Sequence, residues 1–474
     1  MKQLLWINGE HVEGEISEPL YSPYSKEMIS EVARASKEQF HEAIQAAHEA
    51  FPTFKSIPAF KRAEILEKVV AFLKRDREEC ARLIAQEAAK PIKTALAEVD
   101  RTIMTYTFAA QEARRIYGET IPLDAAPGGE GRVAFTVREP LGVVAAITPF
   151  NFPMNLVAHK VGPAIASGNT VVLKPASQTP LSAYRIAHYF HEAGLPKGVL
   201  NVVTGSGKIA GEAFVKDERV KMITFTGSPV VGKWLREHAG LKRVTLELGS
   251  NSAVIVDEGV NISNIVPRVV TGAFTYQGQV CISVQRIFVH SSLYDSFVDQ
   301  FVKETKKLTL GNPLHHETDI SALISEEEVE RIQNWIQEAV NHGARLEYGG
   351  KVINRMLQPT VLLNASLSDK ISCQEVFGPV VHINRFDYFD EVIEAVNDSS
   401  YGLQVGVYTN DVNKAFRASR ELHVGGVMIN EIPTFRVDHM PYGGVKMSGM
   451  GREGIKYAIE EVTEIKLISF KLTE

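Results

Sequence analysis

The sequence contains few cysteines. Only Cys80, Cys281 and Cys373 occur among 474 residues, and they lie far apart. Three scattered cysteines form neither a disulfide scaffold nor a zinc motif, and they fit a protein of a reducing compartment. The 14 histidines show no metal-ligand spacing either. We therefore expect no metal, a cytoplasmic location, and that any cysteine with a chemical role works alone.

Long hydrophobic runs and a strong net charge are also absent. The apolar run at residues 4–7 is too short for the core of a signal peptide. No later stretch approaches the ~20 apolar residues that span a bilayer. The formal net charge of -6 offers no basic field to nucleic acid or anionic lipid. We expect neither a nucleic-acid nor a membrane partner, which leaves small-molecule chemistry.

The sequence does contain a clear succession of helix and strand patterns. From Ser36 to about Arg115, apolar residues recur at steps of three to four, which predicts an α-helical lead-in. Residues 118–139 alternate around proline and glycine turns, which predicts two strands that form an interaction arm. The alternating segment 464–472 predicts a strand that could pair with this arm, within one chain or between subunits.

Two α/β series follow Pro140. The first series has β-rich runs separated by helical stretches, at residues 142–147, 169–175, 199–205, 221–227 and 243–249. This pattern predicts a doubly wound parallel sheet, which binds ligands at the carboxyl ends of its strands. Further runs, at 252–257, 285–290, 359–364, 380–386, 404–410 and 425–430, predict a second domain. The expected fold class is therefore α/β.

Glycine-bearing turns follow several of the predicted strands. Gly207 lies in one such turn, and Gly227 with Ser228 lies in another. A turn of this kind that leads into a helix presents backbone N–H groups and the positive end of the helix dipole to a phosphate. A single turn can equally serve only to reverse the chain. Several in consecutive β-α units favour a nucleotide cofactor.

Three residues are candidates for reaction chemistry. Cys281 is a possible nucleophile, although a lone cysteine is more often a packing residue, as we expect for Cys80 and Cys373. Glu247 lies between two leucines, which predicts a dry setting that raises its pKa toward that of a general base. Its alternative is a salt bridge at the edge of the core. Asn151, held between prolines, is either an oxyanion donor or a turn residue.

The order and spacing of several residues resemble the aldehyde dehydrogenase superfamily, essentially from end to end. They are Asn151, Lys174, Glu247, Cys281, the segment Glu-Val-Phe-Gly-Pro at 375–379 and the segment Pro-Tyr-Gly-Gly-Val-Lys-Met-Ser-Gly at 441–449. The resemblance implies that a Cys281 thiolate attacks an aldehyde, and that the Asn151 amide and the Cys281 backbone N–H hold the oxyanion. Glu247 would activate the water that hydrolyses the resulting thioester. Lys160 resembles the family's structural lysine behind the active site.

The resemblance also implies a nicotinamide cofactor. It places Lys174 on the adenine ribose, Gly227 and Ser228 on the pyrophosphate, and Glu375 with Phe377 on the nicotinamide ribose and ring. The other residues expected at the cofactor are Ile147, Thr148, Pro149, Phe150, Gly207, Phe225 and Leu248. Ser177 stands where many NAD-specific members have a glutamate that repels a 2′-phosphate. The expected cofactor is therefore NADP or NAD, with NADP at least tolerated.

Within the family, segments 279–286 and 434–444 look most like a group that acts on small hydroxylated or anionic aldehydes. That group includes lactaldehyde, non-phosphorylating glyceraldehyde-3-phosphate, and sulfo- or phosphono-aldehyde dehydrogenases. Arg436 and His439 are the expected substrate residues. The Arg436 guanidinium could bind a phosphate, sulfonate or carboxylate. Alternatively, Arg436 forms an ion pair with Asp438 or with a neighbouring subunit.

The resemblance also implies a division of the chain. We expect a Rossmann-like cofactor domain at 1–118 and 141–246, a catalytic domain at 247–443, an oligomerisation arm at 119–140 and 461–474, and a return segment at 444–460. Such an arm implies a homodimer or homotetramer.

Two other functions stay open on the same scaffold. A CoA-acylating enzyme generally lacks the glutamate that activates water. A non-catalytic structural protein would be expected to lose Cys281, Glu247 or Asn151, and all three are present.

Overall fold

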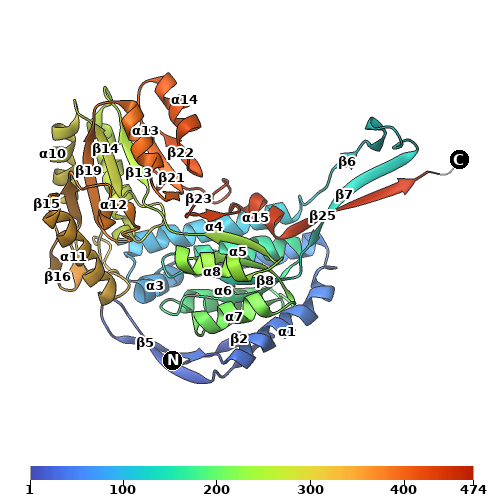
Figure 1. Ribbon diagram of the computed structural model, residues 1–474. Helices are drawn as coiled ribbons and strands as arrows, with labels where there is room; N and C mark the ends of the chain where they lie inside the picture. Colours follow the sequence, from blue (N-terminus) through green and yellow to red (C-terminus); the bar gives the residue numbers. More distant parts are fainter. Residues whose placement is uncertain (1, 473–474) are drawn as a thin grey trace.

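The computed structural model describes residues 2–472, which form two large sheets flanked by helices and a β arm that extends away from them (Figure 1). The predicted α/β class is confirmed. No helix within residues 2–472 is long and apolar enough to cross a bilayer. The same residues contain no group of His, Cys, Asp or Glu side chains that could hold a metal ion.

The predicted helical lead-in consists of four helices. They are α1 (Lys37–Phe54), α2 (Ala59–Arg75), α3 (Arg77–Ala88) and α4 (Ile92–Ala113). Ser36 begins α1 with a capping box, in which its side chain accepts from the Gln39 backbone while the Gln39 side chain accepts from the Ser36 backbone. A small sheet that the sequence patterns did not predict precedes them, made of β1 (Lys2–Gln3), β4 (Ile16–Tyr21) and β5 (Met28–Arg34).

The first large sheet has the strand order β24-β12-β11-β8-β9-β10-β2-β3. The five strands of the first predicted series form its parallel centre: β8 (Val143–Ile147), β9 (Thr170–Lys174), β10 (Leu200–Val202), β11 (Val220–Thr226) and β12 (Arg243–Glu247). Three short strands extend it with antiparallel pairing: β2 (Leu5–Ile7), β3 (Glu10–Val12) and β24 (Gly449–Met450). The sheet is flanked by α5 (Asn155–Ser167), α6 (Leu181–Glu192), α7 (Gly207–Lys216) and α8 (Pro229–His238).

The strand order reverses beside β8. From β8 the chain proceeds to β9 and β10 on one side, then returns to β11 and β12 on the other. The loops that follow β8 and β11 therefore leave the sheet in opposite directions and open a crevice between them. Residues from Thr148 follow β8, and Gly227 follows β11, so both predicted cofactor segments lie at this switch point.

The second large sheet contains all six strands of the second predicted series. In spatial order its strands are β15 (Arg345–Tyr348), β18 (Thr360–Leu363), β19 (Val380–Phe386), β14 (Arg286–His290), β13 (Ala253–Val256), β21 (Gln404–Tyr408) and β22 (Gly426–Ile429). Its helices are α9 (Ile262–Phe274), α10 (Tyr294–Thr305), α11 (Glu326–Asn341), α12 (Lys370–Cys373), α13 (Phe389–Asn397) and α14 (Val412–Glu421). Smaller pairs are β16 (Val352–Ile353) with β17 (Met356–Leu357), and β20 (Tyr401–Gly402) with β23 (Val445–Lys446).

The arm is a three-stranded antiparallel sheet (Figure 1). It comprises β6 (Thr120–Ile121), β7 (Arg132–Pro140) and β25 (Thr463–Lys471), and helix α15 (Ile455–Glu461) leads into β25. The predicted C-terminal strand pairs with β7 of the same chain along its whole length. Four apolar side chains at this end of the chain are more than half exposed: Ile465, Leu467, Phe470 and Leu472.

A buried ion pair links the helical lead-in to the first sheet. Lys90, before α4, pairs with Glu98 on α4, and neither side chain is exposed. Glu98 Oε1 also accepts hydrogen bonds from Met154 N and Asn155 N at the start of α5, at 2.9 and 3.2 Å. Lys90 Nζ donates to the backbone oxygen of Asn151 at 2.6 Å. The pair thus ties the loop after β8 to α4.

Replacing Glu98 by glutamine should destabilise the protein strongly. The Lys90 ammonium would stay buried without its counter-charge, and breaking a buried pair in this way costs about 3–5 kcal/mol. Urea denaturation followed by circular dichroism measures the loss of free energy of unfolding. Asp100→Asn is the matched control on the same helix, because Asp100 pairs with Arg77 at the surface, and its midpoint should stay at the wild-type value. Equal midpoints for the two variants would contradict the assignment.

Candidate active site

A cavity of about 400 Å³ lies at the crevice of the first sheet and reaches α11 and the loops around Cys281 and Glu375. It gathers predicted site residues from distant segments of the chain: Pro149, Phe150, Asn151, Gly227, Ser228, Glu247, Leu248, Cys281, Glu375 and Phe377. The other expected site residues do not line it: Ile147, Thr148, Lys160, Lys174, Ser177, Gly207, Phe225, Arg436 and His439. One concave surface therefore holds the candidate nucleophile, base and oxyanion donor.

A strained loop delivers Cys281 to the cavity. The 3₁₀ turn Thr275–Gly278 has left-handed φ angles at Tyr276 (50°) and Gln277 (54°). Gly278 also has a positive φ of 71°, and a Cβ there would lie 2.1 Å from the Gly378 carbonyl oxygen. Only glycine therefore fits at position 278. This close packing fixes the segment that leads to Cys281.

The Cys281 sulfur lies in a dry environment. Burial raises the pKa of its thiol to about 11. The Tyr442 hydroxyl, 2.9 Å from Sγ, and the Arg436 guanidinium act in the opposite direction and favour the thiolate. The carboxylates of Glu375 and Glu247 disfavour it. A thiolate here depends on its neighbours for stabilisation.

Glu247 ends β12 with an unpaired, buried carboxyl group. Within residues 2–472, neither of its carboxylate oxygens has a hydrogen-bond partner. Burial, reinforced by the negative charge of Glu453, raises the pKa of Glu247 well above its usual range. The salt bridge that was its alternative is not formed within those residues. A carboxyl in this state can take up a proton readily and hold it.

The Asn151 side chain is also buried at the cavity wall. Its Nδ2 donates to the Gln279 backbone oxygen at 3.0 Å, which leaves its second N–H free to point elsewhere. The Lys90 contact holds the Asn151 backbone from behind. Two hydrogen bonds therefore hold Asn151, one at its side-chain amide and one at its backbone oxygen.

The far end of the crevice is positively charged. Lys174 ends β9, and burial together with the nearby charge of Arg34 lowers its pKa to about 8. Arg34 lies on β5, where its Nε donates to Glu18 at 2.8 Å and its Nη2 approaches the Ser177 backbone oxygen at 3.5 Å. Within residues 2–472, the buried Nη1 of Arg34 has no partner. An unpaired guanidinium donor beside Lys174 and Ser177 suits a phosphate.

The remaining cofactor candidates also fit a dinucleotide. The N-terminus of α8 begins at Pro229 directly after Gly227 and the capping residue Ser228, and this helix end suits a pyrophosphate. Glu375 accepts from Ser250 N at 2.9 Å, although burial raises its pKa to about 7. The rings of Phe377 and Phe150 meet edge to face at 5.7 Å.

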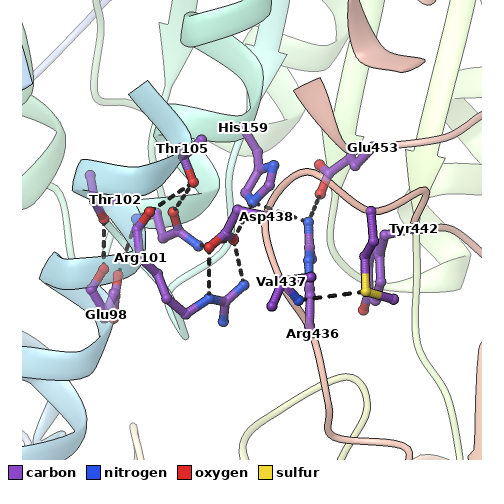
Figure 2. Close-up of polar contacts among 12 residues, drawn as sticks. Glu98, Arg101, Thr102, Thr105, His159, Arg436, Val437, Asp438, Tyr442 and Glu453 are labelled. Atoms are coloured by element: carbon purple, nitrogen blue, oxygen red, sulfur yellow. Dashed lines mark hydrogen bonds and ion pairs between the residues drawn. The ribbon is translucent and has the colours of Figure 1, made fainter. Parts of the chain in front are cut away.

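Behind the cavity, an ionic network surrounds Arg436 (Figure 2). Arg436 Nη2 bonds Glu453 at 2.9 Å and approaches His159 at 3.2 Å. Asp438 instead pairs with Arg101 at 2.7 Å and with His159 at 2.8 Å. The ion pair between Arg436 and Asp438 that was one sequence-based alternative is therefore not formed.

The two other predicted residues of this region have separate contacts. Lys160 Nζ donates to Thr224 Oγ1 at 3.1 Å and to Glu453 at 3.2 Å, so Glu453 joins two buried cations. The His439 ring packs against Phe108, with centroids 4.8 Å apart, away from the main cavity.

Several residues at the site were not singled out from the sequence. Arg34, Arg101 and Glu453 meet the predicted residues only through tertiary contacts, and no local pattern marked them. Lys90 stands before a proline without any other signal. Tyr442 lies inside the segment 441–449, whose place along the chain marks the family resemblance but assigns no role to the tyrosine.

Comparisons with known proteins agree with this geometry. Residues 6–468 match the model of the aldehyde dehydrogenase family. The chain is 47% identical over 468 residues to a 3-sulfolactaldehyde dehydrogenase of Priestia megaterium, covering 99% of this chain and 98% of the relative. It is 42% identical over 468 residues to a lactaldehyde dehydrogenase of Methanocaldococcus jannaschii, covering 98% of each.

Solved structures are equally similar. Aldehyde dehydrogenase 21 from Physcomitrella patens, in complex with the reaction product succinate, has a TM-score of 0.97 at 40% identity and covers 99% of this chain and 98% of its own. Glyceraldehyde-3-phosphate dehydrogenase GapN from M. jannaschii, complexed with NADP, has a TM-score of 0.93 at 40% identity, with coverages of 97% and 100%. With a cysteine, a buried glutamate and a dinucleotide crevice meeting in one cavity, this chain belongs to the aldehyde dehydrogenase family and is an NAD(P)-dependent aldehyde dehydrogenase.

Proposed function

We propose that the protein oxidises a small hydroxylated or sulfonated aldehyde to its carboxylic acid through a thioester on Cys281. The observation that carries this proposal is the single cavity shared by Cys281, Glu247 and Asn151. The Cys281 thiolate attacks the carbonyl carbon, a C–S bond forms, and the carbonyl electrons move to oxygen. The free N–H of Asn151 and the Cys281 backbone N–H donate to that oxyanion.

A bound nicotinamide would supply the acceptor for the hydride that leaves the former aldehyde carbon as its C=O bond re-forms and the thioester results. The residues that would hold the cofactor are Lys174 and Ser177 at the adenosine, the Gly227–Ser228 turn at the pyrophosphate, and Glu375 with Phe377 at the nicotinamide end. Gly207, Phe225, Leu248 and residues 147–150 complete the proposed set. The positive end of α8 and the edge-to-face aromatic pair support this orientation.

Glu247 is the proposed base for the second half of the reaction. Its raised pKa makes the carboxylate a strong enough base to take a proton from water as that water attacks the thioester carbon. The C–S bond then breaks, its electron pair returns to sulfur, and the acid leaves. Lys160 is a positioning residue in this scheme, because it acts through Glu453.

The substrate class is proposed from the relatives and from Arg436. The relatives named above act on sulfolactaldehyde and on lactaldehyde, which are short and carry a hydroxyl. Arg436 is buried and paired with Glu453, yet its Nε has no partner within residues 2–472. An orphaned charged donor near the reacting sulfur favours a substrate with an anionic end. We propose that His439, whose ring packs against Phe108, is an outer contact for the same substrate.

Assembly, domain division and location complete the proposal. We propose that the arm joins subunits into a homodimer or homotetramer, because the exposed apolar side chains of its last strand need a cover. The proposed domains are those expected from the sequence, with 444–460 returning the chain to the first sheet, as the pairing of β24 with β12 supports. We propose a cytoplasmic location, because the three cysteines are free, as is usual in a reducing compartment.

Replacing Glu247 by glutamine should trap the thioester. One equivalent of reduced cofactor should form rapidly, because attack by Cys281 does not require hydrolysis, and steady-state turnover should then fall at least about a hundredfold. Stopped-flow absorbance measures both phases. Cys281→Ala should show neither phase, whereas Cys373→Ala should behave as wild type, since that thiol does not line the cavity and donates to the Ser368 carbonyl oxygen.

The burst experiment also separates the rival functions. Recovery of steady-state turnover by the Glu247→Gln enzyme on addition of CoA would favour the CoA-acylating alternative. Normal turnover by Cys281→Ala would reject the thioester mechanism.

The cofactor preference should follow Arg34 and Ser177. Arg34→Gln should weaken NADP binding about tenfold or more, through loss of a charge-assisted contact to the 2′-phosphate, and leave NAD binding unchanged. Isothermal titration calorimetry of the enzyme without aldehyde measures both dissociation constants. Ser177→Glu should shift the ratio of kcat/KM values toward NAD. A wild-type enzyme that greatly prefers NAD, with a ratio unmoved by Ser177→Glu, would overturn this preference.

Arg436→Gln should raise KM for sulfolactaldehyde about tenfold more than KM for lactaldehyde. The two substrates differ at the anionic group, so the uncharged aldehyde is the internal control for general damage to the site. Steady-state assays over a panel that adds glyceraldehyde-3-phosphate and succinic semialdehyde provide the measurement. Equal increases in KM for charged and uncharged aldehydes would show that Arg436 does not recognise the anion.

A further inference from the structure

Tyr442 touches the reacting sulfur, and the mechanism above assigns it no role. Its hydroxyl oxygen lies 2.9 Å from Cys281 Sγ, within hydrogen-bond distance. The ring is buried in one apolar cluster with Val280, Ile282 and Leu403, against which Cys281 also packs. Packing in this cluster therefore holds the Tyr442 hydroxyl next to the Cys281 sulfur.

We propose that Tyr442 is a catalytic residue that donates a hydrogen bond to the Cys281 thiolate, both before attack and when thiolate leaves the thioester. This inference rests on the proposed role of Cys281 as nucleophile. It assigns a chemical role to the Pro-Tyr-Gly-Gly segment, in which a Cβ at Gly443 would lie 2.9 Å from the Glu247 carboxylate.

The direction of this hydrogen bond follows from the chemistry of the two groups. A thiolate has no proton, so it can only accept. The phenol keeps its proton, because burial and the facing charge of Cys281 raise the pKa of Tyr442 well above its usual range. Tyr442 is thus a neutral donor throughout, and no proton is transferred from it.

Arg436 strengthens this donor. Its guanidinium carbon lies 3.7 Å from the centre of the Tyr442 ring, in a cation–π contact. Glu453 holds Arg436 in that position through a 2.9 Å bond. A cation against the ring draws electron density from the hydroxyl oxygen, which makes the O–H a better donor to an anion.

Few of the groups around the Cys281 sulfur stabilise a thiolate. The ionisable groups that act on Cys281 are Tyr442, Arg436, Glu375 and Glu247. The two carboxyl groups and burial all oppose a thiolate. Of the two groups that favour it, Tyr442 is the one within hydrogen-bond distance of Sγ. Much of the local support for the negative sulfur therefore comes from a single hydroxyl.

The proposed role is the same at the two steps of the reaction. In the resting enzyme the Sγ–H proton leaves to Glu247 or to water, and the hydroxyl stabilises the sulfur anion. While the thioester exists, sulfur is neutral and the hydrogen bond is weak. When water attacks the carbonyl carbon, the C–S electron pair returns to sulfur, and the same O–H group stabilises it as leaving group.

Tyr442→Phe tests the proposal with little change in shape. Alkylation of Cys281 by iodoacetamide, followed by peptide mass spectrometry between pH 7 and 9 without cofactor, reports the reactive thiolate separately from Cys80 and Cys373. Loss of the hydrogen bond should raise the Cys281 pKa by about one to two units. The alkylation rate should fall about three- to fifteen-fold, because the lost thiolate is partly offset by higher nucleophilicity.

Tyr276→Phe is the matched control. Tyr276 belongs to the same apolar cluster, but its hydroxyl donates to the Ala88 carbonyl oxygen at 3.0 Å instead of to sulfur. Its alkylation rate should equal that of the wild type. An equal slowing in both variants would assign the effect to packing and overturn the proposal.

Replacement of Tyr442 by 3-fluorotyrosine provides a change of opposite sign. Its more acidic phenol is a stronger donor and should speed alkylation. Wild-type alkylation rates in a folded Tyr442→Phe protein would overturn the inference, even where Cys281→Ala abolishes turnover. Normal turnover by Cys281→Ala would instead reject the proposed function itself, so the two failures are distinguishable.

Discussion

Dehydration of the reacting groups is the constraint on which the rest of this site depends. Burial raises the pKa of both Cys281 and Glu247. For the thiol this disfavours the reactive form, whereas for the carboxyl it creates a strong base. Burial therefore makes the Glu247 carboxylate a better proton acceptor, and it makes the Cys281 thiol a weaker acid. Water at this wall would weaken both effects and also the hydrogen bonds that hold an oxyanion.

Behind the reacting groups, Glu453, Lys160 and Arg436 form a group of linked ion pairs. Glu453 bonds Lys160 and Arg436, and although burial opposes its ionisation, these cations lower its pKa to about 2. Glu453 therefore stays charged at neutral pH, and its charge contributes to the raised pKa of Glu247. One buried carboxylate serves as a fixed support, and its neighbour remains free to exchange a proton.

The sequence predicts the sheets well, because buried parallel strands read as continuous apolar runs between turns. It also predicts which segments supply the cavity, since motif order is preserved along the chain. It does not predict the strands near the N-terminus, some of which are only two or three residues long. Nor could it reveal that Arg34 approaches Ser177, or that Arg436 pairs with Glu453 in place of Asp438. Those choices depend on side-chain packing between distant segments, which no local pattern encodes.

Arg436 links the buried carboxylate of Glu453 to the Tyr442 ring beside the reacting sulfur. One nitrogen bonds Glu453, one face lies on the Tyr442 ring, and Nε has no hydrogen-bond partner among residues 2–472. Lys160, Arg436 and Glu453 together carry one net positive charge, enough to offset one anion. An anionic aldehyde and a thiolate would draw on that same charge. The Tyr442 hydroxyl is a neutral donor directed at sulfur. A substrate anion does not compete with the thiolate for this hydrogen bond.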